Sequence, residues 1–223
     1  MEPELTGKQH QELGQYLSWF RDEPHRDPLK IALLISGDRS AALINPDPWI
    51  SLRSPLTFCD GSVELFNLFG LESRKIRDMP AWIAARNSLR LDLLPTRVNS
   101  CASYHRRLGT ILGYPADAID YFSNFDEITV PEQYAEDSSL DVEEVAYTQF
   151  VFYIPRPTSE GYQQAISLGK ERYSRLCMLA DLWQLPDIKS LADEIREEFI
   201  RTIESNEQRI AREKRNRLLK KEG

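Results

Sequence analysis

Residues 106–122 read RRLGTILGYPADAIDYF, and this stretch is the strongest single indication of the fold in the sequence. Apolar residues recur at helical spacing before Gly113, Tyr114 and Pro115, and a second apolar pattern begins directly after them. A glycine can supply the left-handed residue that ends a helix, and a proline supplies the fixed φ of a first turn. The stretch therefore predicts two helices joined by a tight structural corner.

A helix, a tight turn and a second helix also form the outline of a helix-turn-helix DNA-binding motif. The second helix of such a motif offers basic and amide side chains to phosphates and base edges. Here it carries Asp117 and Asp120, with Asp126 just beyond, and phosphate groups would repel these carboxylates. We therefore interpret the stretch as a corner and not as a DNA-reading element.

The segment LGTILGYPADAIDYF, residues 108–122, resembles a segment of uncharacterised prokaryotic families, notably archaeal ones, in which Leu-Gly-Tyr-Pro precedes a short helix. Some members carry a Cys-Cys pair directly after Gly-Tyr-Pro, and others carry a His-Glu pair ahead of it. This sequence has Asp117-Ala118 in the first place and Arg106-Arg107 in the second. The resemblance implies a shared corner and brings no activity, cofactor or catalytic residue with it.

Composition points to a folded protein without a membrane partner. Of the 223 residues, 41% are hydrophobic, which is enough to bury a core, and the net charge of −7 disfavours indiscriminate nucleic-acid binding. No apolar run approaches the ~20 residues that span a bilayer, and the polar N-terminus predicts neither a signal nor a transit peptide. Three widely spaced cysteines, Cys59, Cys101 and Cys177, favour reduced thiols over a disulfide framework. We expect a cytoplasmic protein.

Charge is distributed in blocks along the chain. Residues 74–107 contain eight basic and two acidic residues, a net charge of +6, and residues 117–144 contain ten acidic and no basic residues. The two blocks could attract one another within the fold or across a dimer. Two solvated faces are the preferred interpretation, because exposed ion pairs contribute only ~0–1 kcal/mol each.

Hydrophobic periodicity predicts an α+β protein dominated by helices. A small antiparallel sheet is expected from a hairpin over 29–45 and from a strand over 145–154, whose residues are largely β-branched and aromatic. Helices are expected to cover that sheet, and the acidic stretch 126–144 reads as a loop or mobile arm. The expected helices are 6–21, 62–70, one beginning at Pro80, one from Asn99 or Ser100 to Gly113, one from Pro115, one from Ser159 and one from Asp187 to the C-terminus. The chain divides into a globular domain, 1–186, and a C-terminal helical extension, 187–223.

Cys101 and His105 are the candidate metal ligands. They are four residues apart, so they lie on one face of a helix and could supply two of the ligands that a zinc site requires. No third residue at ligand spacing completes the set, although Cys59 or Cys177 could be brought in by the tertiary fold. A core cysteine beside a hydrogen-bonded histidine is the preferred interpretation, so we expect no metal and no cofactor.

Enzyme signatures are largely missing from the sequence. It contains no GxGxxG, GxxxxGK[ST], GxSxG or HExxH pattern, and only three histidines. We therefore expect a protein–protein interaction or structural role, with a partner or a second copy bound through the C-terminal helix. Two alternatives stay open: a small-molecule or metal-dependent enzyme with its site near Cys101 and His105, and a weak nucleic-acid binder that uses 74–107 and the basic C-terminal tail.

Overall fold

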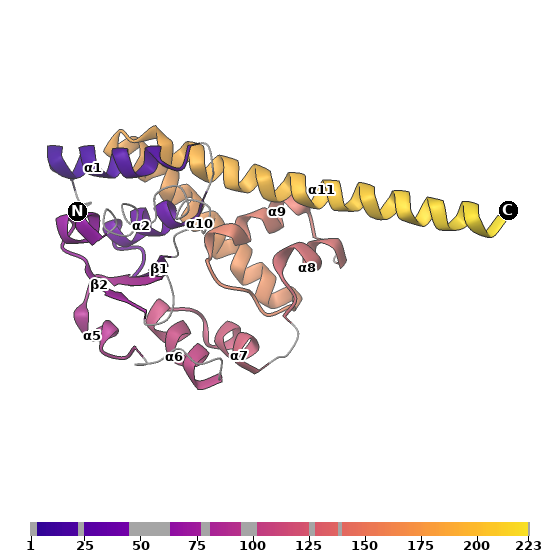
Figure 1. Ribbon diagram of the computed structural model, residues 1–223, viewed down its shortest axis with the longest axis horizontal. Coiled ribbons are helices and arrows are strands. Elements are labelled where there is room, and N and C mark those ends of the chain that lie inside the picture. Colours follow the sequence, from indigo (N-terminus) through magenta and orange to yellow (C-terminus); the bar gives the residue numbers. More distant parts are fainter. Residues whose placement is uncertain are drawn as a thin grey trace.

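The structure, a computed structural model, describes residues 4–21, 25–44, 63–76, 81–94, 102–124, 128–137 and 140–222, the last sixteen of them as backbone only. It is a helix-dominated α+β fold with one three-stranded sheet (Figure 1). In chain order the elements are α1 (Gly7–Ser18), α2 (Asp27–Ser36), β1 (Ala41–Ile44), a helical turn at 63–68, β2 (Glu72–Lys75), β3 (Trp82–Ala85), α5 (Ser88–Leu91), α6 (Ala102–Leu112), α7 (Ala116–Asn124), α8 (Pro131–Asp137), α9 (Val142–Val145), the 3₁₀ helix η1 (Ala146–Phe150), α10 (Ser159–Trp183) and α11 (Pro186–Glu222).

The sheet is antiparallel with the order β1-β3-β2, so β3 is the central strand. Ala41 pairs with Ala85 on one side of β3, and Glu72 pairs with the same residue on the other side. Side chains alternate between the two faces of a strand. Ala42 and Ala84 therefore pack with α1, α2, α10 and α11, whereas Ala41 and Ala85 pack with α5 and α6. The sheet separates two hydrophobic clusters.

The predicted hairpin over 29–45 is wrong, because its first half is helix α2. The segment DPLKIALLIS is buried on nearly every side, with Leu29, Ile31 and Leu33 fully inaccessible. A helix that is apolar all round shows no helical period, so it cannot be told from a buried strand by periodicity. Gly37, at φ 94°, ends the helix, and only Ala41–Ile44 forms a strand.

The predicted strand over 145–154 is also wrong. Asp141 accepts a hydrogen bond from the backbone N–H of Glu143 and caps α9, and the chain continues directly into η1. Within η1 the Thr148 hydroxyl donates to the Val145 carbonyl at 2.7 Å. Tertiary packing against α10 overrides the β-propensity of this segment.

Two further predictions need correction. The expected helix from Pro80 is instead the central strand β3 followed by the short helix α5, while Pro80 itself lies outside the described residues. The expected loop over 126–144 holds the short helices α8 and α9. Burial explains the first error. Because β3 is covered on both faces, its residues do not alternate between apolar and polar as those of a half-exposed strand do.

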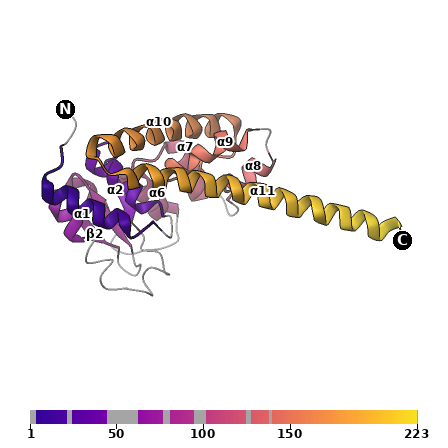
Figure 2. The same cartoon turned by 90° about the horizontal axis from the view of Figure 1, so that it is seen from above.

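Other helices agree with the prediction, namely α1, the turn at 63–68, α6, α7, α10 and α11. Thr6 caps α1 and Thr158 caps α10. The first half of α11 belongs to the core, since Leu191, Ile195 and Ile203 are buried, and the helix then runs on past the other elements (Figures 1 and 2). None of the described helices has both the length and the apolarity needed to cross a membrane.

Candidate functional site

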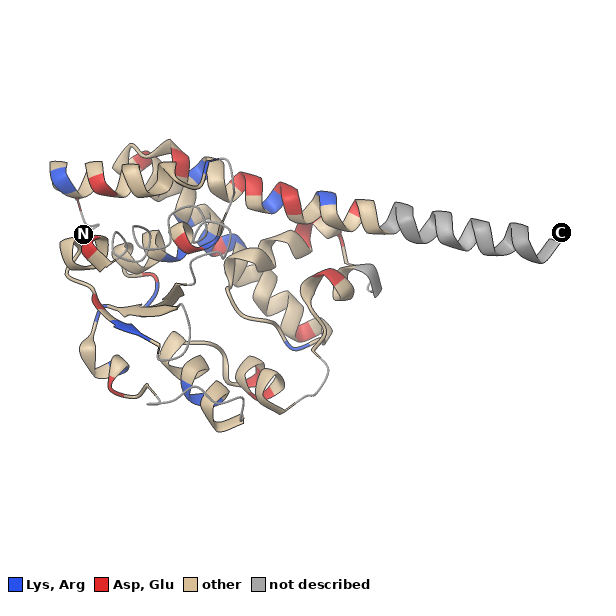
Figure 3. Cartoon of the chain, in the orientation of Figure 1, with Lys and Arg blue, Asp and Glu red and all other residues tan. Residues whose placement is uncertain are grey.

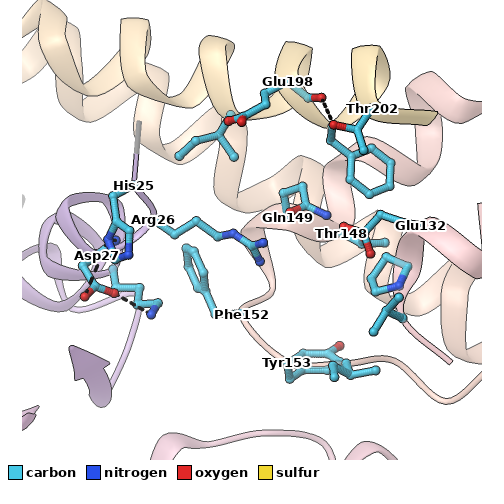
Figure 4. A pocket seen from close by; sticks show the side chains of 16 residues that line it. His25, Arg26, Asp27, Glu132, Thr148, Gln149, Phe152, Tyr153, Glu198 and Thr202 are labelled. Atoms are coloured by element: carbon cyan, nitrogen blue, oxygen red, sulfur yellow. Dashed lines mark hydrogen bonds and ion pairs between the residues drawn. The ribbon is translucent and has the colours of Figure 1, made fainter. Parts of the chain in front are cut away.

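A pocket of about 640 Å³ lies between four segments that are far apart in the sequence. Its walls come from the start of α2, the start of α8, η1 with the residues that follow it, and the middle of α11 (Figure 4). Small-molecule sites in proteins have volumes of roughly 300–1,000 Å³. The lining residues are His25, Arg26, Asp27, Lys30, Val130, Pro131, Glu132, Thr148, Gln149, Phe152, Tyr153, Ile154, Ile195, Glu198, Phe199 and Thr202.

The start of α2 contributes a buried ion pair to the pocket wall. Asp27 is the first residue of the helix and is fully buried, and Lys30 lies one turn later on the same face. Lys30 Nζ is 2.6 Å from Asp27 Oδ1 and also donates to the Leu43 carbonyl at 3.0 Å. Burial lowers the pKa of Lys30, while the Asp27 carboxylate opposes that shift. The pair fixes a charged group of each sign at this end of the pocket.

His25 is oriented by the same turn of the chain. Its Nδ1 accepts a hydrogen bond from the backbone N–H of Asp27 at 3.2 Å and lies 3.7 Å from Asp27 Oδ2. A ring nitrogen that accepts a hydrogen bond carries no proton, so the neutral ring bears its proton on Nε2. The Asp27 backbone N–H thus holds the His25 ring in one orientation at this end of the pocket.

The pocket carries charge of both signs. Arg26 reaches across it towards Gln149, while Glu132 and Glu198 project from α8 and α11 (Figure 4). Desolvation lowers the pKa of Arg26, and the charges of Glu132, Asp27 and Glu198 raise it. The three carboxylates therefore offset part of the cost of burying the Arg26 charge.

Phe152 has an unusual backbone conformation at the floor of the pocket. Its φ of 62° places a bulky side chain in the left-handed region, which costs roughly 1–3 kcal/mol. Arg172 on α10 holds the preceding backbone, because its Nη1 donates to the carbonyls of Phe150 and Val151 at 3.2 and 2.8 Å. Backbone strain of this kind is found preferentially at ligand clamps and switch regions.

Three cations lie around the Phe152 ring. Its centroid is 4.9 Å from Arg39 Cζ, 5.9 Å from Arg172 Cζ and 5.8 Å from Lys30 Nζ. A cation–π contact contributes about 0.5–2 kcal/mol. Together the three contacts contribute a stabilising free energy similar in size to the cost of the backbone strain, so they can hold the ring in place.

Arg39 is the most buried of these cations, with a relative exposure of 5%. Its Nε donates to the Ala41 carbonyl at 3.2 Å, whereas its buried Nη1 has no hydrogen-bond partner among the described residues. Burial lowers the pKa of Arg39, and Tyr114 opposes the shift. Burial and the charge of Arg39 lower the pKa of Arg172 to about 10. Positive charge is therefore in excess behind Phe152, where Asp27 is the one fully buried carboxylate among the described residues.

The predicted corner contacts this cluster. Gly113 has φ 72° and ends α6, so the left-handed C-cap is confirmed. The Tyr114 ring lies 6.0 Å from Arg39 Cζ and 5.5 Å from the ring of Tyr153, which lines the pocket. Burial raises the pKa of the Tyr114 hydroxyl. The structural corner thus consists of Gly113, Tyr114 and Pro115. It also places the Tyr114 ring beside Arg39 and Tyr153, behind the pocket.

No family model, curated protein or solved structure matches this chain. The resemblance of residues 108–122 to archaeal families accordingly stays a prediction. The contacts, burial and charges around the pocket are the observations on which a functional proposal can rest.

The candidate metal ligands lie away from the pocket. His105 is half-buried on α6, with its ring edge-on to Phe122 at 5.2 Å and to Tyr104 at 5.6 Å. Cys101 and Cys59 lie outside the described residues. Within the described part of the chain, no group of three or more histidine, cysteine, aspartate and glutamate residues could hold a metal ion. Burial raises the pKa of the Cys177 thiol on α10.

Acidic residues of the segment 117–144 pair with basic residues of the same chain. Figure 3 colours the acidic and basic residues along the ribbon. Asp120 pairs with Arg106 of the basic block at 3.5 Å. Glu143 pairs with Arg196 at 3.3 Å, and Glu144 pairs with Lys170. Within the described residues, the acidic segment thus pairs with α10 and α11 as well as with the basic block.

Sequence reasoning missed the main residues of the pocket, above all Lys30, Arg39, Phe152 and Arg172. The i, i+3 spacing of Asp27 and Lys30 was a usable signal once the segment was read as a helix. Phe152 gave no signal, because a positive φ at a phenylalanine follows from packing and not from local sequence. Arg39 and Arg172 are 133 positions apart and meet only in the folded chain.

Proposed function

We propose that this protein binds a small polar organic molecule with charged groups of both signs, in the pocket between α2, α8, η1 and α11. The single observation that carries the proposal is the pocket itself, whose size and mixed lining suit a small ligand. Ile195 and Phe199 provide apolar surface, Arg26 and Lys30 provide positive charge, and Glu132 and Glu198 provide carboxylates.

The charge pattern selects the ligand class. An acidic group on the ligand is attracted by Arg26 and Lys30, and an amino group is attracted by Glu132 and Glu198. Free amino acids, dipeptides and phosphate-bearing amines have this combination. The buried ion pair of Asp27 and Lys30 favours a preformed site, because its geometry is fixed before any ligand arrives.

A pocket-filling variant tests the proposal. Thr202 lines the pocket from α11 and is exposed, so Thr202→Trp should fold and should block the site. The matched control is Glu204→Trp, which adds the same side chain two residues further along α11, also at an exposed position. Thermal unfolding is measured with the twenty amino acids, a set of dipeptides and phosphoethanolamine.

At least one compound should raise the melting temperature of the wild type. A ligand at 100 times its Kd stabilises by ~2.7 kcal/mol, which corresponds to roughly 5–10 °C for a chain of this size. Thr202→Trp should lose this shift and Glu204→Trp should keep it. The proposal is wrong if no compound shifts the wild type, or if the shift survives in Thr202→Trp.

Association through α11 is a second proposal, favoured by the length of this helix beyond the core. α11 continues to Glu222, well past the buried Ile203, and residues 209–223 carry a net charge of +5. Light scattering on the full chain and on residues 1–208, at low and high salt, tests it. Self-association should be lost on truncation and weakened by salt. A monomer under every condition would exclude self-association.

A further inference from the structure

The guanidinium groups of Arg39 and Arg172 lie beside the Phe152 ring, with their Cζ atoms 4.9 and 5.9 Å from its centroid. Arg39 has a relative exposure of only 5%, and its Nη1 has no hydrogen-bond partner among the described residues. A buried donor without a partner is costly, and a buried charge without a counter-ion is costlier still. A ligand that accepts a hydrogen bond from this Nη1 would remove that cost.

Among the described residues, the carboxylates nearest this cluster are bonded to other cations or exposed. Asp27 is already bonded to Lys30, and Asp38, next to Arg39 in sequence, is bonded to Arg175 at 2.6 Å. Glu171 is exposed on α10, and Asp117 is exposed on α7. The tyrosines Tyr114 and Tyr153 border the cluster, and their raised pKa values keep their hydroxyls neutral. They can therefore donate to an anion.

Phe152 separates the cluster from the pocket. The ring lines the pocket, while Arg39 lies against the ring at 4.9 Å and is not part of the pocket wall. The strain of its φ of 62° means that a different conformation of this residue is favoured locally. A ligand that binds the guanidiniums better than the ring does would shift that balance.

We propose that Arg39 and Arg172 form an oxyanion subsite of the pocket, which takes a phosphate or carboxylate group when the Phe152 ring moves aside. Guanidinium groups suit such oxyanions because they present paired N–H donors in one plane. Arg172 keeps its bonds to the backbone carbonyls through Nη1 and offers its remaining N–H groups. This assignment rests on the proposed ligand-binding role of the pocket and places the ligand's acidic end.

The test uses inorganic phosphate as the probe, measured by isothermal titration calorimetry on the full chain. Phe152→Gly removes the covering ring and relieves the positive φ. The variant also loses the packing of Phe152 against the core, so circular dichroism must show that it folds. With the ring gone, phosphate no longer competes with the cation–π contacts, and its affinity should rise roughly tenfold over the wild type. Acetate, in a parallel titration, separates a preference for phosphate from one for carboxylate.

Arg39→Gln in the Phe152→Gly background identifies the subsite. The glutamine amide can still donate to the Ala41 carbonyl, so folding should be preserved, and circular dichroism checks this. The gain in phosphate affinity should disappear. Arg107→Gln, which removes one exposed positive charge on α6, is the matched control for net charge and should keep the gain. Arg172→Gln in the same background is a second test of the subsite and should also abolish the gain in phosphate affinity.

The outcomes separate this proposal from the previous one. If Phe152→Gly binds phosphate no better than the wild type, or if the gain survives Arg39→Gln, the oxyanion subsite is wrong even where the pocket ligands bind. If phosphate binds through Arg39 while none of the amino acids or dipeptides binds the wild type, the subsite stands and the proposed ligand class fails.

Discussion

Gly169 of α10 lies directly beneath the backbone carbonyl of Tyr147, and a Cβ at Gly169 would come within 2.0 Å of that oxygen. The absence of a side chain at Gly169 allows η1, residues 146–150, to approach α10 this closely. The pocket floor at Phe152 follows directly from η1, so the close approach at Gly169 also positions the candidate site.

Gly169→Ala should therefore destabilise the protein. Relieving a backbone clash by moving packed elements costs about 1–3 kcal/mol or more, which exceeds the ~1 kcal/mol that alanine gains over glycine within a helix. Gly7→Ala is the control, because nothing lies within 4 Å of its added Cβ, and it should be neutral or slightly stabilising. Urea unfolding measures both variants. Equal stability of Gly169→Ala and the wild type would refute the packing argument.

Gly113→Ala should destabilise for a different reason. The added Cβ would meet only the Ser40 hydroxyl at 3.5 Å, an ordinary contact, but φ of 72° is left-handed. The expected cost is ~1 kcal/mol, or about 2–4 °C in melting temperature. Gly113→Asn should cost less, because asparagine tolerates this conformation. An unchanged melting temperature in the alanine variant would contradict the C-cap.

Replacing one member of the Asp27 and Lys30 pair should be more harmful than replacing both. Lys30→Met leaves a fully buried carboxylate without its ammonium, at a cost of roughly 3–5 kcal/mol. Asp27→Asn combined with Lys30→Met removes both charges, so the double variant should be more stable than Lys30→Met alone. A double-mutant cycle by urea unfolding gives the coupling energy. Additive effects would show that the pair does not act as a unit.

Tyr162→Phe should be neutral or stabilising at pH 7. The Tyr162 hydroxyl is buried with no hydrogen-bond partner among the described residues, and its ring stacks on Tyr134 at 3.7 Å. Deleting an unsatisfied hydroxyl gains up to about 1 kcal/mol, while the phenyl ring keeps the stacking. A loss of more than that amount would reveal a partner for the hydroxyl.

The same substitution should change the response to alkaline pH. Burial raises the pKa of Tyr162 well above its usual value, so the folded protein keeps this phenol protonated. In the unfolded chain the Tyr162 phenol ionises near pH 10. The folded state therefore loses none of its stability through this group below pH 10, and it becomes progressively less stable relative to the unfolded chain as the pH rises above 10. Tyr162→Phe should lose less stability above pH 10 than the wild type. Parallel alkaline curves would contradict the raised pKa.

Metal analysis tests the candidate ligands Cys101 and His105. We expect no stoichiometric zinc or iron in the purified protein, because a half-buried His105 packed on Phe122 is explained by aromatic contacts. Elemental analysis of the wild type and of Cys101→Ser measures this. Stoichiometric metal that disappears in Cys101→Ser would favour the metal-dependent alternative.

Several helices could be predicted from the sequence because their signals are local. α10 begins after Thr158, whose side chain accepts from the backbone N–H of Gly161, and α6 ends at Gly113. Helical periodicity was visible in these segments because each has one buried and one exposed face. The helix-dominated α+β class followed from that pattern.

The sheet and the pocket could not be predicted in the same way. α2 is buried on nearly all sides, and η1 has the composition of a strand, so periodicity and propensity both pointed to β-structure there. Their true conformations depend on what covers them. β3 shows the converse, since the covered Ile83 and Ala84 were read as part of a helix.

The sequence by itself determined the amphipathic helices, their caps and the Gly113 corner, because those features depend on residues a few positions apart. Only the tertiary structure decided the candidate site. Arg39 lies 4.9 Å from the Phe152 ring although 113 positions separate the two residues. The positive φ of Phe152 and the buried charge of Arg39 are both locally unfavourable. Such features persist only where packing from several distant segments outweighs local preference, and for that reason no local pattern revealed them.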